Sequence, residues 1–197
     1  TKSGLTFQGN GMGALNAFDS SNGEILWSKD IQTSMIAPPV TYKINNEQYI
    51  VILAGTGGGN NHGGDTLGFH TEHVASLKYG NNGRLLAFKI DGKKTLPRLD
   101  LVDRTIPEQP KITSTEFEIS RGTELYGEYC AFCHGTAVRS GPALPDLRMM
   151  SNDSHELFNE IVYNGIYSEN GMTAFSDVMS KNDVNNIYHY IVDTAKN

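Results

Sequence analysis

The sequence predicts a chain of mixed fold class, in which an all-β segment comes first and an all-α segment follows. Short apolar runs separated by turn residues fill the first half, and helical apolar periodicity fills the last third of the 197 residues. Between them, residues 95–111 hold prolines and no periodic pattern, which is typical of a linker. The net charge divides at nearly the same place, because residues 1–110 hold ten acidic and ten basic side chains whereas residues 111–197 hold twelve and six. We therefore expect two domains, residues 1–94 and residues 112–197.

Turn chemistry marks the ends of the expected strands. Asn10-Gly11 and Ser21-Asn22-Gly23 separate the first three apolar runs, and Ile44–Glu47 reads as a hairpin turn. The expected strands are Leu5–Gln8, Ala14–Phe18, Ile25–Lys29, Val40–Lys43 and Gln48–Ala54.

An internal similarity indicates a repeating β architecture. The run Gly13–Asp19 resembles Gly83–Lys89, seventy positions further along the chain. A repeat of this kind cannot bury its own sheet face alone, so we expect the β segment to belong to something larger.

Three apolar stripes predict helices in the last third. Leu125, Tyr126 and Tyr129 share one face of a helix that leads into the two cysteines. A second helix is expected over Ser154–Asn164, ended by Gly165. Ser180 is the expected N-cap of the last helix, whose apolar positions are Val184, Ile187, Tyr188, Ile191 and Val192.

Composition narrows the classes of function. The longest apolar run, Tyr49–Ala54, is far shorter than the roughly 18 residues that a membrane-spanning helix needs, so we expect no transmembrane segment. The acidic last third argues against a nucleic-acid partner and suits either a basic or neutral protein partner or a merely solubilising surface. The chain begins at Thr1 without a signal peptide, which favours a mature or fragmentary chain.

The run CAFCH holds both cysteines of the chain, Cys130 and Cys133, and is completed by His134. A disulfide between them would close a very small loop, and structural zinc needs further ligands at matching spacing. Cys-x-x-Cys-His is the attachment signature of c-type haem. Residues i and i+3 share a helical face, so the two thiols reach one porphyrin edge. We expect Cys130 and Cys133 to tether haem c and His134 to ligate its iron; disulfide and zinc remain the alternatives.

A methionine usually completes the ligand set of low-spin electron-transfer haem, and the chain has six. Two lie in the β segment, and two follow His134 too closely to reach the opposite haem face: Met12, Met35, Met149 and Met150. Met172 lies in a non-helical stretch between two expected helices, where its side chain can be aimed at iron. We expect Met172 to be the second iron ligand and Met179 to pack in the core.

Two further features bear on the haem. The backbone carbonyl of Pro142 or of Pro145 is expected to hold the second ring nitrogen of His134, although ordinary loop punctuation explains both prolines equally well. Arg148 is expected either to pair with a haem propionate or to be a plain surface arginine.

A different kind of site is the rival in the glycine-rich stretch before residue 83. His62, Asp65, His70 and His73 lie within twelve residues of one another and form a candidate metal-binding loop. Solvated loop histidines are the simpler interpretation.

Several motifs together carry a resemblance to known families. Residues 119–195 resemble a small class I cytochrome c domain through the motifs Leu125-Tyr126, CAFCHG, Pro145-Asp146-Leu147, Gly171-Met172 and Tyr190. The whole chain resembles the C-terminal portion of a quinohaemoprotein alcohol dehydrogenase. In the β segment, three stretches carry this resemblance. Residues 13–27 resemble the family's tryptophan-docking motif, residues 49–59 resemble the strand and loop that approach the quinone, and residues 83–97 resemble the strand that closes the propeller.

The resemblance implies a function in electron transfer. In this family a β-propeller holds pyrroloquinoline quinone (PQQ) and calcium, and reduced PQQ passes electrons to the haem. The haem would hand them to an external acceptor, a soluble redox protein or ubiquinone, in the periplasm. The family's adjacent-cysteine disulfide, calcium ligands and catalytic aspartate have no counterpart here, and Thr56 stands where the family often has a bulky aromatic. We therefore expect no catalytic residue in this chain, and alcohol oxidation only together with a missing N-terminal propeller portion.

One alternative keeps the haem and drops the quinone. In this interpretation the chain is a stand-alone periplasmic electron carrier, and its β segment is a non-catalytic docking platform.

Overall fold

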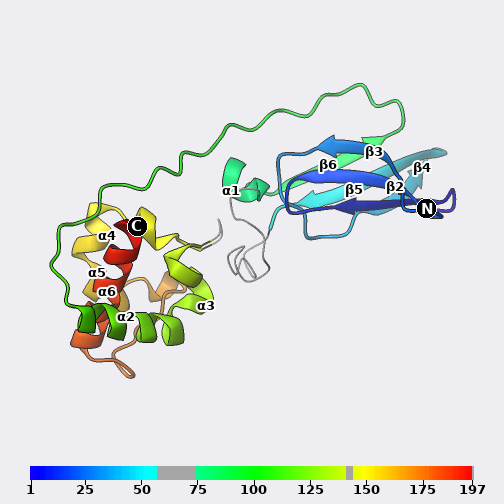
Figure 1. Ribbon diagram of the computed structural model, residues 1–197. Helices are drawn as coiled ribbons and strands as arrows, with labels where there is room; N and C mark the ends of the chain where they lie inside the picture. Colours follow the sequence, from blue (N-terminus) through cyan, green and yellow to red (C-terminus); the bar gives the residue numbers. More distant parts are fainter. Residues whose placement is uncertain (57–73, 141–143, 197) are drawn as a thin grey trace. The chain divides into compact units, whose positions relative to one another are not determined.

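The computed structural model describes residues 1–56, 74–140 and 144–196, and it shows strands in the first part and helices in the last (Figure 1). The chain divides into two compact units, residues 1–103 and residues 104–197. The division falls inside the stretch that the sequence predicts to be a linker. The predicted mixed fold class is confirmed by this element order.

Two three-stranded antiparallel sheets make up the described part of the β unit. The first has the order β1-β2-β3, formed by Leu5–Gly9, Ala14–Asp19 and Ile25–Asp30. The second has the order β4-β5-β6, formed by Val40–Ile44, Glu47–Ala54 and Arg84–Lys89. The five predicted strands are all present. The predicted hairpin is confirmed as well, since Ile44 pairs with Glu47 across a two-residue loop of positive φ.

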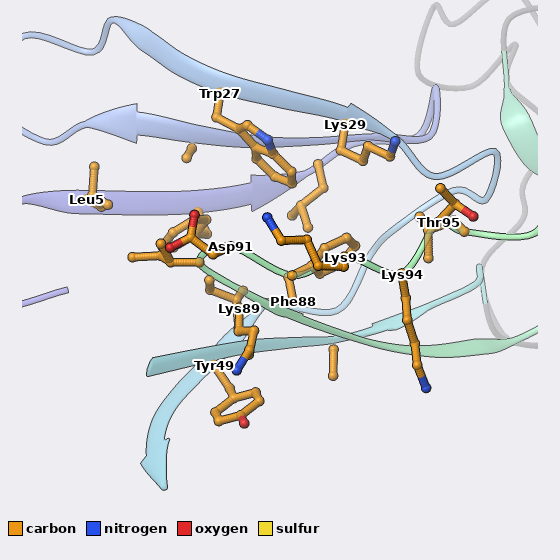
Figure 2. Close-up of a pocket in the computed structure, with 18 of the residues that line it drawn as sticks. Leu5, Trp27, Lys29, Tyr49, Phe88, Lys89, Asp91, Lys93, Lys94 and Thr95 are labelled. Atoms are coloured by element: carbon orange, nitrogen blue, oxygen red, sulfur yellow. The ribbon is translucent and has the colours of Figure 1, made fainter. Parts of the chain in front are cut away.

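The two sheets share one small core. Met35 bridges to Gly55 between them, and Trp27 of the first sheet meets Phe88 of the second edge to face at 5.9 Å. The buried core residues come from both sheets and their connections: Leu15, Ile31, Met35, Ile52, Ala54 and Leu86. A cavity of about 1120 Å³ is lined by both sheets beside Trp27 and Phe88, and Figure 2 shows lysine side chains around it. The chain's own side chains therefore do not fill the space between its sheets.

The internal similarity between Gly13–Asp19 and Gly83–Lys89 does not correspond to equivalent strands. β2 is the central strand of its sheet, whereas β6 lies at an edge of the other. In the sequence match Leu15 corresponds to Leu85, yet Leu15 is fully buried and Leu85 is 72% exposed. Side chains alternate between the two faces of a strand, so the buried faces of β2 and β6 are one residue out of phase.

Helices occupy the described part of the second unit, and one short helix, α1 (Ala75–Tyr79), belongs to the first. The longest are α2 (Glu116–Tyr129) and α6 (Lys181–Lys196). The others are α3 (Ala131–His134), η3 (Thr136–Val138), η4 (Leu147–Met149), α4 (Asn152–Glu156), α5 (Phe158–Val162) and η5 (Ser168–Asn170).

Capping boxes define the start of both long helices. Ser180 and Asp183 exchange side-chain and backbone hydrogen bonds at the N-terminus of α6, as the sequence predicts. Thr115 and Glu118 do the same for α2. The box at α2 has the standard Ser/Thr-x-x-Glu pattern, whereas the one at α6 has aspartate in the last position; our sequence interpretation missed the box at α2.

The helix predicted over Ser154–Asn164 is wrong as a single helix. The structure breaks it into α4 and α5 at Leu157, whose φ and ψ of −91° and 8° lie outside the helical region. Phe158 and Val162 of α5 are buried, whereas Leu157 at the break is 40% exposed. Gly165 ends this stretch with a φ of +72°, a conformation that favours glycine.

Helices α2 and α6 pack closely together at Gly122. A Cβ atom there would collide with the backbone oxygen of Asn186 and lie 2.8 Å from the Cβ of Tyr190. One turn later, the rings of Tyr126 and Tyr190 pack with their centroids 5.1 Å apart. Gly122 therefore sets how near the two helices approach.

Among the described helices, none combines the length and the apolar content that crossing a bilayer requires.

We expect Gly122→Ala to lower the free energy of unfolding of the helical unit by about 2 kcal/mol or more, because the added methyl must push the α6 backbone away. Denaturant titration followed by far-ultraviolet circular dichroism measures this. Gly127→Ala is the matched control, since a Cβ at Gly127 in the same helix meets no heavy atom within 4 Å. It should raise the stability by roughly 0.5–1 kcal/mol, as Gly to Ala does in a helix. Equal effects of the two substitutions would contradict a close contact at Gly122.

Candidate functional site

The segment Cys130–His134 forms one helical turn at the end of α2. The Cys130 N–H still bonds to the Tyr126 carbonyl, and the N–H groups of Cys133 and His134 both bond to the Cys130 carbonyl, at 3.1 and 2.9 Å. The predicted i, i+3 and i+4 spacing is therefore realised on one turn. Both cysteines are free thiols; Cys130 is buried and Cys133 is exposed.

Two groups hold this turn in place from behind. The buried Tyr126 hydroxyl donates to the backbone carbonyls of His134 and Gly135, at 3.1 and 2.8 Å. Gly135 has a φ of +73°, and a Cβ on it would collide with the Arg139 carbonyl. The chain can therefore turn sharply after His134 only with glycine at this position. Tyr126 lies on the predicted apolar face of the helix, but no sequence pattern indicates the contacts of its hydroxyl group.

The His134 side chain is oriented by a backbone carbonyl. Its Nδ1 lies 3.0 Å from the Pro145 oxygen. A carbonyl can only accept, so Nδ1 carries the proton and Nε2 keeps the lone pair that a metal needs. Burial lowers the pKa of His134, and the Pro145 bond raises it by a smaller amount. Of the two predicted carbonyls, Pro145 is the one in contact; Pro142 lies outside the described residues.

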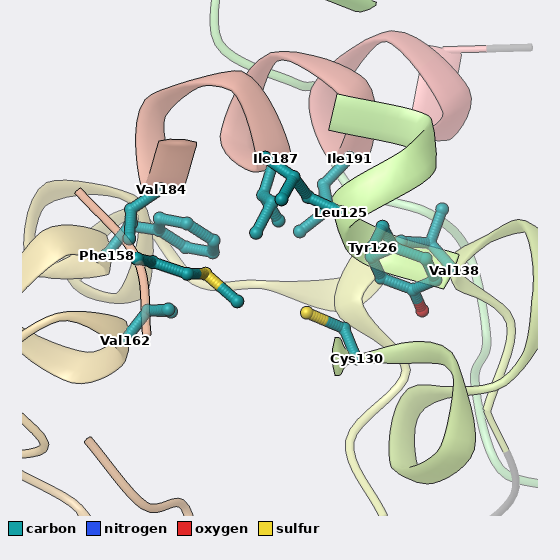
Figure 3. Close-up of a cluster of buried hydrophobic side chains, with 10 residues drawn as sticks. Leu125, Tyr126, Cys130, Val138, Phe158, Val162, Val184, Ile187 and Ile191 are labelled. Carbon is teal, nitrogen blue, oxygen red and sulfur yellow. The ribbon is translucent and has the colours of Figure 1, made fainter. Parts of the chain in front are cut away.

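The environment of Cys130 keeps its thiol neutral. Burial, and to a lesser extent the neighbouring Cys133, raise the pKa of Cys130 to about 12. The sulfur lies in the core of the unit, next to side chains of α2, α5 and α6 (Figure 3). A buried cysteine of this kind is less reactive as a thiolate than an exposed one.

The structure brings Met172 to the same core as Cys130. Gly171 has a left-handed φ of +93°, and the Met172 N–H bonds to the Tyr167 carbonyl. The Met172 side chain is partly buried and packs against the cluster that contains Cys130. Met179 is buried within that cluster, as predicted. Met172 remains the predicted second ligand.

Arg148 is held by the carboxylate of Asp146, two residues before it. Its Nε and Nη2 donate to the two oxygens of Asp146 at 3.0 and 2.7 Å. Only 19% of the Arg148 side chain and 5% of that of Asp146 are exposed. The interpretation of Arg148 as a plain surface arginine is therefore wrong. Its pairing with a propionate remains a prediction.

The residues present fit a covalently bound haem c. Two thiols and a neutral imidazole share one turn, and a thioether packs on the same core. Around that core, side chains that are only partly buried offer an apolar lining for a porphyrin: Tyr129, Leu147, Met150, Ile161, Tyr163 and Phe175. The donor set of one histidine and one methionine is that of low-spin electron-transfer haem.

The rival metal-binding loop cannot be placed in the same way, since His62, Asp65, His70 and His73 lie outside the described residues. Within the described ranges, no group of three or more histidine, cysteine, aspartate or glutamate side chains is arranged to hold a metal ion.

Family models match both units of the chain. Residues 1–50 match the beta-propeller domain of glucose/ethanol/alcohol dehydrogenases. Residues 117–191 match the model described as cytochrome c oxidase, cbb3-type, subunit III.

Curated relatives match almost the whole chain. Quinohemoprotein alcohol dehydrogenase ADH IIB of Pseudomonas putida is 33% identical over 98% of this chain and 27% of its own length. The dehydrogenase subunit of alcohol dehydrogenase (quinone) from Gluconobacter oxydans is 34% identical over 99% of this chain and 25% of its own. Lupanine 17-hydroxylase [cytochrome c] from a Pseudomonas species is 33% identical over 99% and 27%. The chain thus spans about a quarter of the length of these relatives.

Solved structures agree with these matches. The quinohemoprotein alcohol dehydrogenase ADHIIG from Pseudomonas putida has a TM-score of 0.82 at 29% identity, over 98% of this chain and 27% of that one. The enzyme from Comamonas testosteroni has a TM-score of 0.71 at 25% identity, with the same coverage. The predicted resemblance and the predicted fold class, a propeller segment followed by a cytochrome c domain, are both confirmed.

Proposed function

Because this chain is similar in sequence and fold to about a quarter of the length of quinohaemoprotein alcohol dehydrogenases, we propose that it carries the electron outlet of such an enzyme. A covalently bound haem c accepts electrons from reduced PQQ and passes them to an external acceptor. The observation that carries this proposal is the turn of Cys130, Cys133 and His134, with its imidazole oriented by Pro145, in the unit that matches cytochromes.

Each residue of the turn has a definite role in this proposal. Cys130 and Cys133 tether the haem, one from inside the core and one from the surface. His134 would supply Nε2 to the iron while Pro145 holds Nδ1, and Met172 would supply the second ligand. The haem supplies one-electron redox chemistry, and a histidine–methionine ligand pair raises its potential. The buried cluster around Cys130 keeps water from this side of the site.

The β unit supports a larger assembly. Leu53 and Leu85 face each other across β5 and β6 and are 61% and 72% exposed, while Ile52 and Leu86 beside them are buried in the core. β5 is therefore apolar on both faces, which is typical of a strand covered on both sides. Exposed apolar residues on β4, which pairs with β5, extend this surface: Val40, Tyr42 and Ile44.

We propose that the missing N-terminal propeller portion, with PQQ and calcium, covers these faces. The acceptor is a soluble redox protein or ubiquinone, and the acidic charge of residues 111–197 suits a basic protein acceptor. We infer a periplasmic location, because covalent attachment of haem c in this family takes place outside the bacterial cytoplasm.

Covalent attachment is tested by extraction. We expect the haem to stay with the protein in acidified acetone and the reduced protein to show a sharp low-spin c-type spectrum, because two thioether bonds survive denaturation. Replacing Cys130 and Cys133 together by Ala should release the haem into the acetone. Extractable haem in the parent protein would overturn the proposed attachment.

The second ligand is tested by Met172→Ala. This change should abolish the methionine-to-iron charge-transfer band of the oxidised protein and lower the reduction potential, because a methionine ligand favours the reduced iron. Met179→Leu is the matched control, a volume-conserving change of a buried methionine that should leave the band in place. Loss of the band in the Met179 variant alone would show that the ligand had been assigned to the wrong methionine.

The source of the electrons is tested on the full assembly of this chain with its propeller portion. We expect bound PQQ in the purified assembly and reduction of the haem when a primary alcohol is added under anaerobic conditions. Assembly prepared without PQQ is the control, and its haem should stay oxidised. An assembly that lacks quinone, with a haem reducible only by external donors, would instead identify the stand-alone carrier.

A further inference from the structure

The carbonyl that orients His134 belongs to the residue just before a tightly held carboxylate. Asp146 follows Pro145 directly, and its side chain is 5% exposed. Its Oδ1 accepts from the Arg148 Nε at 3.0 Å and from the Arg148 backbone N–H at 3.2 Å. Its Oδ2 accepts from Arg148 Nη2 at 2.7 Å and from Arg104 Nη2 at 3.0 Å. A nearly buried carboxylate with four donors cannot reorient without leaving a charge unpaired.

Part of this arrangement comes from a segment far away in the sequence. Arg104 lies 42 residues before Asp146 and is the first residue of the helical unit. Five residues later, the Gln109 side chain donates to the Arg148 carbonyl at 3.0 Å and to the Pro107 carbonyl at 2.9 Å. The stretch that leads into α2 is thus fastened to the loop that carries Pro145.

We propose that Asp146, held between Arg104 and Arg148, is a positioning residue for the iron ligand His134. It fixes the Pro145 carbonyl and so sets the strength of the bond from Nδ1, which in turn sets the reduction potential of the haem. A firmly held acceptor makes the imidazole more basic, and a more basic ligand stabilises oxidised iron. This inference rests on the proposed haem ligation by His134.

Two mechanisms make opposite predictions for Arg104, which allows a sharp test. If Arg104 acts on the iron only as a nearby positive charge, its removal favours the oxidised, more positive haem and lowers the potential. If Arg104 acts by holding Asp146, its removal loosens the Pro145 carbonyl, weakens the bond to Nδ1 and raises the potential. Arg104 is partly exposed, with 33% of its side chain accessible, so its substitution should leave the fold intact.

The test is Arg104→Gln in the haem-loaded 197-residue chain, with redox titration of the haem and nuclear magnetic resonance of the reduced, diamagnetic protein. We expect the potential to rise and the His134 Nδ1 proton to exchange with water about tenfold faster, as loss of a charge-assisted hydrogen bond implies. Arg121→Gln is the matched control: this arginine of the same unit pairs with Glu124 and Asp183. Its removal should lower the potential, as the loss of a positive charge predicts, and should leave the exchange rate of the His134 Nδ1 proton unchanged.

A lower potential with unchanged exchange in Arg104→Gln would overturn the positioning role. Asp146→Asn provides an independent check, because it keeps the shape of the side chain while weakening its bonds to both guanidinium groups. Faster exchange in this variant supports the proposal, and unchanged exchange contradicts it. Covalent haem and the methionine charge-transfer band are recorded for each protein. Their absence from the parent chain would overturn the proposed function, whereas their presence with unmoved exchange overturns only the role of Asp146.

Discussion

The hydrogen bond between His134 Nδ1 and the Pro145 carbonyl is the constraint that the rest of the helical unit serves. The imidazole is carried by the turn that follows α2, and α2 is packed closely against α6 at Gly122. The Tyr126 hydroxyl then binds the turn that carries the imidazole. The other partner of the bond, the carbonyl, is carried by the loop that contains Pro145. The turn that carries His134 and the loop that carries Pro145 must therefore both be held in place for this 3.0 Å hydrogen bond to form.

Burial shifts the pKa of the imidazole and that of the thiol in opposite directions, and both shifts favour the neutral form of the group. It lowers the pKa of His134 and raises that of Cys130, so each group stays neutral. A neutral imidazole is the form that ligates iron, and its protonated nitrogen is directed to Pro145. Asp146 is the exception, a charged group at low exposure, and it is accompanied by two guanidinium groups. The charged groups are therefore Asp146 and its two arginines, next to the predicted ligand His134, while His134 itself is neutral.

The parts that could be predicted from the sequence depend on local patterns. The apolar stripe of α6, the box of Ser180 and Asp183, and the spacing of CAFCH involve residues three to eight positions apart, where helical geometry is fixed. The break at Leu157 could not be predicted, because its neighbours have a continuous helical stripe and the backbone departs from it at one residue. The contact of Arg104 with Asp146 spans 42 residues and is decided by tertiary packing alone. The box of Thr115 and Glu118 is also a local pattern, and our sequence interpretation missed it.

The out-of-phase strands show why the β unit resists interpretation by itself. A repeat inferred from Gly13–Asp19 and Gly83–Lys89 assumes that equivalent residues face the same way, yet Leu15 is buried and Leu85 is exposed. An alternation of apolar and polar residues shows which face of a strand is buried only where the other face is exposed to solvent. β5 has apolar residues on both faces, so its sequence does not distinguish the two sides. In this structure the face of β5 that carries Ile52 is buried and the face that carries Leu53 is exposed, although the residues of both faces are apolar. The helical unit differs from the β unit in this respect, because its two long helices and its shorter ones bury a core of their own around Cys130.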